Sequence, residues 1–361
     1  MHQRQELQGQ EYLNFINAIH SEETKRLYIR ALKHYMRFLK TDNVASLLKQ
    51  DTKTLEQQII SYLVSMKEQQ LSFSMLNNRL MGIKKCYQMN DVVLNWIKIS
   101  QYLGENTRKF KDRAYTTEEI QTLLTKADER MRVVILLLSS TGMRIGGAID
   151  LKLRHLTKIE KYGLYQIVVY ENTTSEYYTF CTPECAIAID SYLAYRSRCY
   201  EKINAESPLI REQFNRNNPD SSRNPRHLPL NTLSHILRDL LIASGIHEVE
   251  HLTEVRTNGR IKKQVATAHG FRKFATTNMI RSKVNPEARE MLLGHSIQLG
   301  DSYYRPLPEE LLNEYLTAVD SLTINEENRL KRKVEILEVK KEKIDQLEET
   351  LRHVKRKLGI A

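Results

Sequence analysis

The stretch MRVVILLLSSTGMRIGGAIDLKLRHL, residues 131–156, is the most apolar part of the chain and constrains its fold most strongly. A run of this kind has to be buried, so it marks the core of one domain. Gly142, Gly146 and Gly147 interrupt the run, which predicts a turn near STG and a new helix after it. The chain has 361 residues, more than one ordinary core serves, so a second domain is expected.

Residues 11–103 have helical patterns, and the segment 21–40 shows them best. Ser21 is a plausible N-cap, and apolar side chains then recur at helical spacing. Basic residues occupy much of the remaining surface of this helix, either as a solvated face or as a face for phosphate contact. Further helices are predicted at 54–68, 74–88 and 91–102.

The chain changes character at residues 104–115, GENTRKFKDRAY, which are polar, basic and aperiodic. This composition predicts a linker. The segment TTEEIQTLL then starts a new helix with Thr116 or Thr117 as its cap. We therefore expect an N-terminal helical domain at 1–103, a linker at 104–115, a second domain at 116–322 and a tail at 323–361.

The second domain is predicted to be mixed. Residues 164–182 indicate a β-hairpin, because two β-branched and aromatic arms flank the polar ENTTSE. Residues 211–230 read as a loop, and the other elements are helices at 184–200, 231–244, 271–282, 286–293 and 308–320. The predicted fold class is mainly α with a small antiparallel β-sheet, an α+β arrangement in two domains followed by a coiled-coil-like helix.

The tail from about residue 325 is charged and almost free of glycine and proline. Its apolar residues alternate steps of four and three, with one phase slip near 344–347, which is heptad spacing with a stammer. The tail either packs on the body as a long helix or self-associates as a coiled coil, and the pattern favours self-association. The seam consists of Leu330, Val334, Leu337, Ile344, Leu347, Leu351, Val354 and Leu358.

Charge and composition limit the class of protein. The formal net charge of +11 favours a polyanionic partner, nucleic acid first. No apolar run approaches the roughly 20 residues of a membrane span, and the first residues lack the apolar stretch of a signal peptide. We expect a cytoplasmic, chromosome- or nucleoid-associated protein. Cys181 and Cys185 have no second pair to complete a zinc site, so no metal is predicted.

Five residues could carry chemistry together. His269 and Arg272 lie three apart on one face of a predicted helix. Arg144 follows a glycine turn inside the apolar segment, where a buried cation requires an anionic partner. His295 follows a glycine, and Tyr304 lies nine residues further on. Arginines can clamp a phosphate, a histidine can move a proton, and a tyrosine hydroxyl can attack phosphorus.

The motifs TGMR, HGFRKFATT and LLGHS, followed by a tyrosine nine residues after that histidine, resemble the tyrosine recombinases in order and spacing. This family includes the Xer proteins, Cre and lambda integrase, and the present chain looks like a mobile-element or archaeal integrase. The resemblance implies a core-binding domain at 1–103 and a catalytic domain at 116–322 that clamp double-stranded DNA.

The resemblance also implies roles by position. Arg144 and Arg272 would stabilise the phosphorane, and His269 would accept the proton of the nucleophile. His295 would hydrogen-bond the scissile phosphate, and Tyr304 would form a 3′-phosphotyrosyl bond. No cofactor, metal or ATP is implied. Residues 308–320 would dock into a neighbouring protomer of a homotetramer, so a chain ending at residue 306 should bind DNA but fail in synapsis.

Some positions depart from the family pattern. The family usually has a lysine in the hairpin turn, but residues 164–182 contain none, and Lys158, Lys161 or another residue would have to substitute. The role of Lys273, next to Arg272, is open.

Two further departures concern the first arginine and the nucleophile. Gly147 stands where an acidic residue is common, and Asp150 either takes the orienting role or caps the surface. Tyr303 lies beside Tyr304, and the spacing favours Tyr304. The alternatives to a recombinase are a type IB topoisomerase-like enzyme and a catalytically inactive DNA-binding protein.

Overall fold

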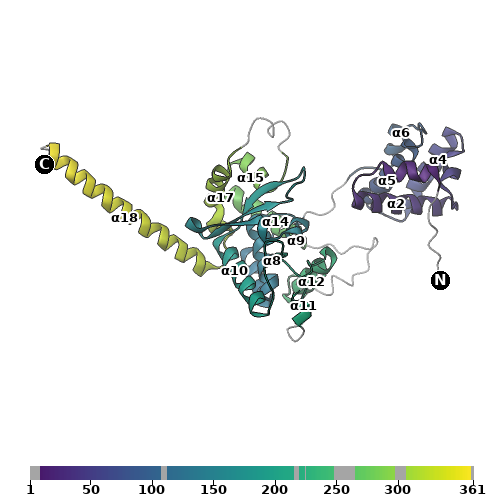
Figure 1. Cartoon of the computed structure of the whole chain (residues 1–361). Helices are drawn as coiled ribbons and strands as arrows, with labels where there is room; N and C mark the ends of the chain where they lie inside the picture. Colours follow the sequence, from purple (N-terminus) through teal and green to yellow (C-terminus); the bar gives the residue numbers. More distant parts are fainter. Residues whose placement is uncertain are drawn as a thin grey trace. The chain divides into compact units, whose positions relative to one another are not determined.

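In the computed structural model the chain forms two compact units (Figure 1). The first unit ends before Asp112, where the second begins. The described residues are 9–106, 112–214, 219–223, 225–247, 265–296 and 306–358.

The first unit is a helical bundle. Its main pair is α2 (Glu22–Phe38) and α5 (Phe73–Gln88), which approach so closely that a Cβ on Gly82 would lie 2.8 Å from Cβ of Ala31. Ser21 caps α2 as predicted. The other helices are α1 (Gln10–Asn17), α3 (Val44–Leu48), α4 (Thr52–Glu68) and α6 (Trp96–Gln101).

The helix predicted at 91–102 is wrong in its first half. Asp91 has a φ of 58°, which ends the preceding helical turn, and α6 begins only at Trp96. Asn95 caps α6 by accepting from the amide of Lys98, while its own amide donates to Glu56 of α4. The cap and this tertiary bond together fix the start of the helix.

The second unit is built around α8 (Glu129–Thr141), which packs against α10 (Pro183–Arg198) and α14 (His269–Arg281). Thr116 caps α7 (Thr117–Lys126) with a capping box, and Gly142 ends α8 before α9 (Ile145–Asp150), as predicted. The remaining helices are α11 (Pro219–Arg223), α12 (Leu230–Ala243), α15 (Pro286–Leu292), α17 (Pro308–Leu322) and α18 (Glu326–Leu358).

A small antiparallel sheet completes the second unit. The predicted hairpin is β2 (Leu164–Val169) with β3 (Tyr177–Phe180), and β1 (Leu156–Ile159) adds a third strand at the β2 edge. Ile167 lies opposite Leu156 on one side and Thr179 on the other. The mainly helical fold with a small antiparallel sheet is thus confirmed.

Residues 211–230 are not the plain loop that their composition predicts. They contain α11, and Arg211 is buried. Its guanidinium donates to Glu201 at 2.5 Å and to the carbonyls of Ser221 and Ser222. Arg196 pairs with the same carboxylate from α10. A buried ion network therefore holds this segment, and a composition rich in proline and asparagine gives no sign of it.

Helix α17 packs within its own unit. Tyr315 is fully buried and donates to the carbonyl of Ser140 at 3.1 Å. A chain that ends at residue 306 would therefore lose part of its own core, and we no longer expect it to retain DNA binding. The buried face consists of Leu311, Leu312, Tyr315, Ala318, Val319 and Leu322.

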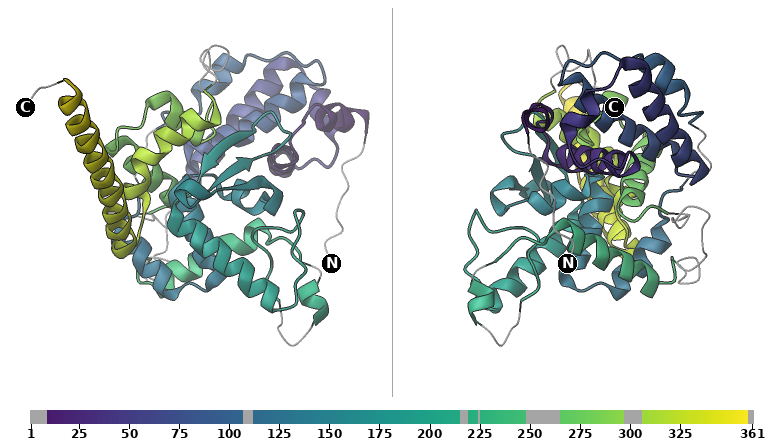
Figure 2. Two further views of the ribbon diagram at one scale, coloured as in Figure 1. Left: turned by 60° about the vertical axis from the view of Figure 1, so that its left-hand side comes forward. Right: turned by 90° about the vertical axis from the view of Figure 1, so that its right-hand side faces the viewer.

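The described contacts between helix α18 and the body lie at its beginning, and Figure 2 shows it as one continuous helix. The Glu184 carboxylate accepts from the amides of Ile324 and Asn325 at 2.8 and 3.1 Å, just before the helix starts. Its described seam residues from Leu330 to Leu351 are exposed. The structure therefore contradicts one of the two predicted alternatives, in which the tail packs on the body as a long helix.

Within the part of the chain that the structure describes, no helix is long and apolar enough to cross a membrane. The four cysteines are free thiols. Among the described side chains there is also no cluster of three or more metal-ligating groups.

Candidate active site

Arg272 is the centre of the site. It lies on α14 and is 7% exposed. One terminal nitrogen, Nη1, donates to the carbonyl of Gly142 at 2.9 Å, and Nη2 donates to the carbonyl of Leu293 at 2.7 Å. Nη2 also lies 2.6 Å from Nε2 of His295. The guanidinium therefore ties the end of α8 to the LLGHS segment.

Two glycines make this arrangement possible. Gly142 has a φ of 66°, and a Cβ there would lie 2.6 Å from Leu293 and 3.0 Å from Ala275 of α14. Gly294 also has a φ of 66°, and a Cβ there would collide with the ring of Tyr177 on β3. Only glycine combines this backbone with such close packing. The glycines of TGMR and LLGHS thus bring three segments together around Arg272.

Arg144 and His295 join the same group. Arg144 is exposed at the start of α9, and its Nη1 donates to the carbonyl of Gly294 at 3.3 Å. That carbonyl directly precedes His295, whose Nε2 faces Arg272. Three of the five predicted residues are therefore brought together, although they are up to 151 positions apart in the chain.

His269 begins α14, one turn before Arg272, and is exposed. The segment leading into it is fixed by Tyr115, which stacks on Phe271 at 4.4 Å and donates to the carbonyl of Thr267 at 2.8 Å. His269 is thus held on the helix that carries Arg272. Tyr303 and Tyr304 lie outside the described residues.

Glu290 belongs to the site and was missed in the sequence. Its carboxylate lies 2.6 Å from Nδ1 of His295 and also accepts from Arg289. Burial by itself raises the pKa of Glu290, but the hydrogen bonds from His295 and Arg289 hold that pKa below its ordinary value. The signal in the sequence was an acidic residue five positions before the histidine, which α15 and the turn after it bring back to the ring.

The electrostatics of the cluster favour an anion. Burial lowers the pKa of Arg272, and the nearby charge of Arg144 lowers it further. Among the described residues, no carboxylate lies within ion-pair distance of either guanidinium. Two close guanidinium groups without a carboxylate partner, one of them buried, are stabilised by an anion that binds both.

The lysines considered for the hairpin position are engaged elsewhere. Lys158 pairs with Asp190 at 2.9 Å, and Nζ of Lys161 lies over the ring of Tyr162. Lys273 donates to the carboxylate and carbonyl of Asp112, and this hydrogen bond is the main cause that holds the pKa of Asp112 below its ordinary value. The described contacts of Lys273 therefore anchor the first residues of this unit to α14.

The glycine at position 147 has a steric explanation. A Cβ there would lie 2.8 Å from Cγ1 of Val169 and 3.4 Å from the ring of Tyr170. The end of β2 thus occupies the space that an acidic side chain would need. Asp150 is exposed at the end of α9.

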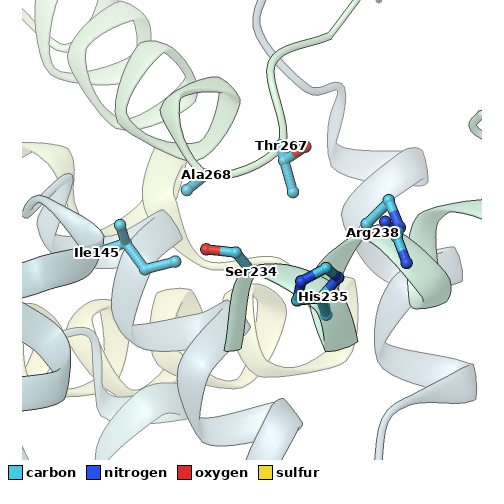
Figure 3. A pocket seen from close by; sticks show the side chains of 6 residues that line it. All are labelled: Ile145, Ser234, His235, Arg238, Thr267 and Ala268. Carbon is cyan, nitrogen blue, oxygen red and sulfur yellow. The ribbon is translucent and has the colours of Figure 1, made fainter. Parts of the chain in front are cut away.

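A pocket of about 380 Å³ borders the cluster (Figure 3). Ile145 and Ala268 on its wall are the sequence neighbours of Arg144 and His269. Helix α12 forms the opposite wall with the hydroxyl of Ser234, the imidazole of His235 and the guanidinium of Arg238. The pocket is lined by Ile145, Ser234, His235, Arg238, Thr267 and Ala268.

Comparison with known proteins agrees with this geometry. The model of the phage integrase family matches residues 113–308, more than half of the chain. The chain therefore belongs to the phage integrase family, the tyrosine recombinases. By family it is a tyrosine-type site-specific recombinase. The comparisons give no support to the alternative of a type IB topoisomerase-like enzyme. No curated protein sequence matches the chain.

Solved structures share the fold at low sequence identity. The Tn1549 transposon integrase in complex with transposon right-end DNA is 16% identical, with a TM-score of 0.56, covering 84% of this chain and 96% of that one. A lambda integrase dimer bound to a COC′ core site is 14% identical, with a TM-score of 0.53, covering 82% and 95%. The XerH recombinase bound to its palindromic difH substrate is 17% identical, with a TM-score of 0.50, covering 87% and 80%.

Proposed function

We propose that this chain cleaves and rejoins double-stranded DNA at specific sites through a 3′-phosphotyrosyl intermediate, without metal or ATP. The observation that carries the proposal is the convergence of Arg144, Arg272 and His295, in which neither guanidinium has a carboxylate partner among the described residues. A scissile phosphate has the charge and the non-bridging oxygens that such a group binds.

Each residue has a role in this proposal. Arg144 and Arg272 bind the non-bridging oxygens and stabilise the charge of the five-coordinate phosphorus. His295 hydrogen-bonds the same phosphate, with Glu290 fixing its ring. His269 accepts the proton of the Tyr304 hydroxyl as that oxygen attacks phosphorus. The bond to the 5′ oxygen breaks, and a 5′ hydroxyl of a partner strand later reverses the reaction.

The partners belong to the same proposal. The net charge of +11 and the DNA complexes of the structural neighbours support binding of duplex DNA by both units, with a chromosome- or nucleoid-associated location. A homotetramer on two sites would be the active assembly. Exchange of the C-terminal helix between protomers would require α17 to leave the pocket that it fills in its own chain.

The second candidate function is a DNA-binding protein that uses the clamp without cleavage. One observation favours it: the hairpin turn between Val169 and Tyr177 has no lysine to protonate the leaving oxygen. Covalent trapping separates the two candidates.

The test uses nicked duplexes from the neighbourhood of the coding gene, incubated with the protein in the presence of a chelator and run on a denaturing gel. We expect a DNA-dependent adduct that Tyr304→Phe abolishes and Tyr303→Phe retains. An adduct lost only in Tyr303→Phe would move the nucleophile by one residue. If a duplex that the protein binds gives no adduct, the recombinase mechanism is wrong for this chain.

A further inference from the structure

The apolar seam of α18 has no partner within the described chain. Six apolar residues are spaced along this 33-residue helix from its second turn to its last third, and each is more than half exposed. Isolated exposed leucines are ordinary, but a continuous stripe of them along one helix marks a binding face. The six residues are Leu330, Val334, Leu337, Ile344, Leu347 and Leu351.

The spacing of the seam suits another helix. From Leu330 the core positions advance by four and three to Leu337, then by four to Lys341 and by three to Ile344. A second step of three leads to Leu347, and this is the stammer, after which the alternation resumes. Lys341 is the polar core position, and a single polar residue there sets the register of a coiled coil at some cost in stability.

The charges beside the seam identify the partner. In a parallel, in-register pair of helices, the residue directly before a core position of one chain lies beside the residue five positions later on the other chain. That second residue directly follows the next core position. Three lysines on the flank of this seam have an acidic residue at that distance. The pairs are Lys333 with Glu338, Lys340 with Asp345, and Lys343 with Glu348.

We propose that α18 binds α18 of a second copy of this chain as a parallel, in-register, two-stranded coiled coil. The described seam from Leu330 to Leu351 is about 32 Å long at 1.5 Å per residue. The bonds of Glu184 before the helix and the 3.5 Å pair of Arg332 with Asp320 tie its first turns to the catalytic unit.

This pairing has a consequence for the reaction. Two catalytic units joined at the start of α18 remain together whether or not DNA is bound. A tether of this kind raises the effective concentration of one unit near the other, so the second DNA contact becomes intramolecular. The inference concerns assembly alone and does not depend on which tyrosine reacts.

The first experiment measures the mass of the full chain without DNA by light scattering after gel filtration. We expect twice the chain mass of 42.3 kDa. The double variant Leu337→Lys, Leu347→Lys should be a monomer. The matched control Gln346→Lys, Glu349→Gln adds the same net charge at exposed positions off the seam and should remain a dimer.

A monomeric unmodified chain, or dissociation of the control together with the seam variant, would overturn the proposal. Covalent trapping of the protein on a nicked duplex serves as the folding check, since formation of the adduct needs only one catalytic unit. The seam variant should form the adduct as the unmodified chain does. Loss of the adduct in every sample would refute the proposed reaction and leave the assembly result standing.

The second experiment tests the charge pairs beside the seam. One triple variant replaces Lys333, Lys340 and Lys343 by glutamate, and the other replaces Glu338, Asp345 and Glu348 by lysine. Each alone should be monomeric because all facing pairs become like-charged, and a mixture should form a one-to-one heterodimer. Homodimers of either variant, or a mixture that stays monomeric, would rule out the pairing of these lysines with these carboxylates.

Discussion

Nη2 of Arg272 lies 2.6 Å from Nε2 of His295, while Nδ1 of the same ring lies 2.6 Å from Glu290. A guanidinium can only donate, so Nε2 accepts, and Nδ1 carries the proton that it donates to Glu290. The ring thus links a buried cation to a carboxylate, and these two contacts fix its orientation beside Arg272.

Glu290→Gln should therefore slow formation of the covalent adduct, by up to about 100-fold, at the low end of what a positioned proton-transfer group contributes. The loss should be similar at pH 6 and pH 8, because the lowered pKa of Glu290 keeps its carboxylate charged at both. Single-turnover rates on a nicked duplex at several pH values measure this. Glu287→Gln, on the exposed first turn of the same helix, is the control. An unchanged rate in Glu290→Gln would mean that the carboxylate has no part in positioning His295.

Arg272→Lys should lower the rate of adduct formation by about 10²–10³-fold, as expected for loss of a donor to the transition state. An ammonium cannot reach the carbonyl of Gly142, the carbonyl of Leu293 and a phosphate with one planar fork. Binding to duplex DNA in a mobility-shift assay should change little. Arg281→Lys, exposed at the end of the same helix, should match the unmodified chain. A fully active Arg272→Lys would remove Arg272 from the chemistry.

Gly147→Ala and Gly146→Ala form a matched pair on α9. A Cβ at Gly147 meets Val169 at 2.8 Å, whereas the nearest atom to one at Gly146 is the Tyr170 hydroxyl at 3.8 Å. We expect Gly147→Ala to destabilise the second unit by about 1–3 kcal/mol through overpacking. Gly146→Ala should be neutral or stabilising by up to about 1 kcal/mol, since alanine is the better helix former. Thermal unfolding of both variants tests the contrast, and similar effects would show that the β2 contact yields easily.

The sequence predicted the second unit best where local chemistry and burial agree. The apolar run 131–156 became α8, a left-handed Gly142 and α9, because the glycine signal and the need for burial point the same way. The motif residues Arg144, Arg272 and His295 come together, and the motif glycines Gly142 and Gly294 permit the close packing because a Cβ at either position would collide with its neighbours.

The sequence was less informative where tertiary contacts decide. The start of α6 depends on a bond from Asn95 to Glu56, 39 positions away, which no local pattern reveals. The burial of Arg211 depends in the same way on Glu201 of another segment. Strand β1 is a short edge strand whose exposed residues Thr157 and Lys158 give no clear alternation.

The Arg196–Glu201–Arg211 network gives the last prediction. The Glu201 carboxylate is fully buried between the two guanidinium groups. Glu201→Gln leaves two buried cations without their anion, which should lower the free energy of unfolding by about 3–5 kcal/mol. Glu206→Gln removes an exposed partner of Lys152 and Arg154 and should leave the free energy of unfolding almost unchanged. Fluorescence of Trp96, the chain's single tryptophan, reports the first unit and should not change in either variant.

The dependence of this difference on pH follows from Glu201. Burial by itself raises the pKa of Glu201, but the hydrogen bonds from Arg196 and Arg211 hold it below its ordinary value. A carboxyl with a lowered pKa stabilises the folded state above its unfolded pKa, and this contribution is lost as the pH falls through the folded pKa. Urea unfolding followed by circular dichroism should therefore show a constant difference between the unmodified chain and Glu201→Gln from pH 7 to about 5, which shrinks below about pH 4. A difference that persists unchanged under acid would mean that packing of the glutamate, and not its charge, stabilises the network.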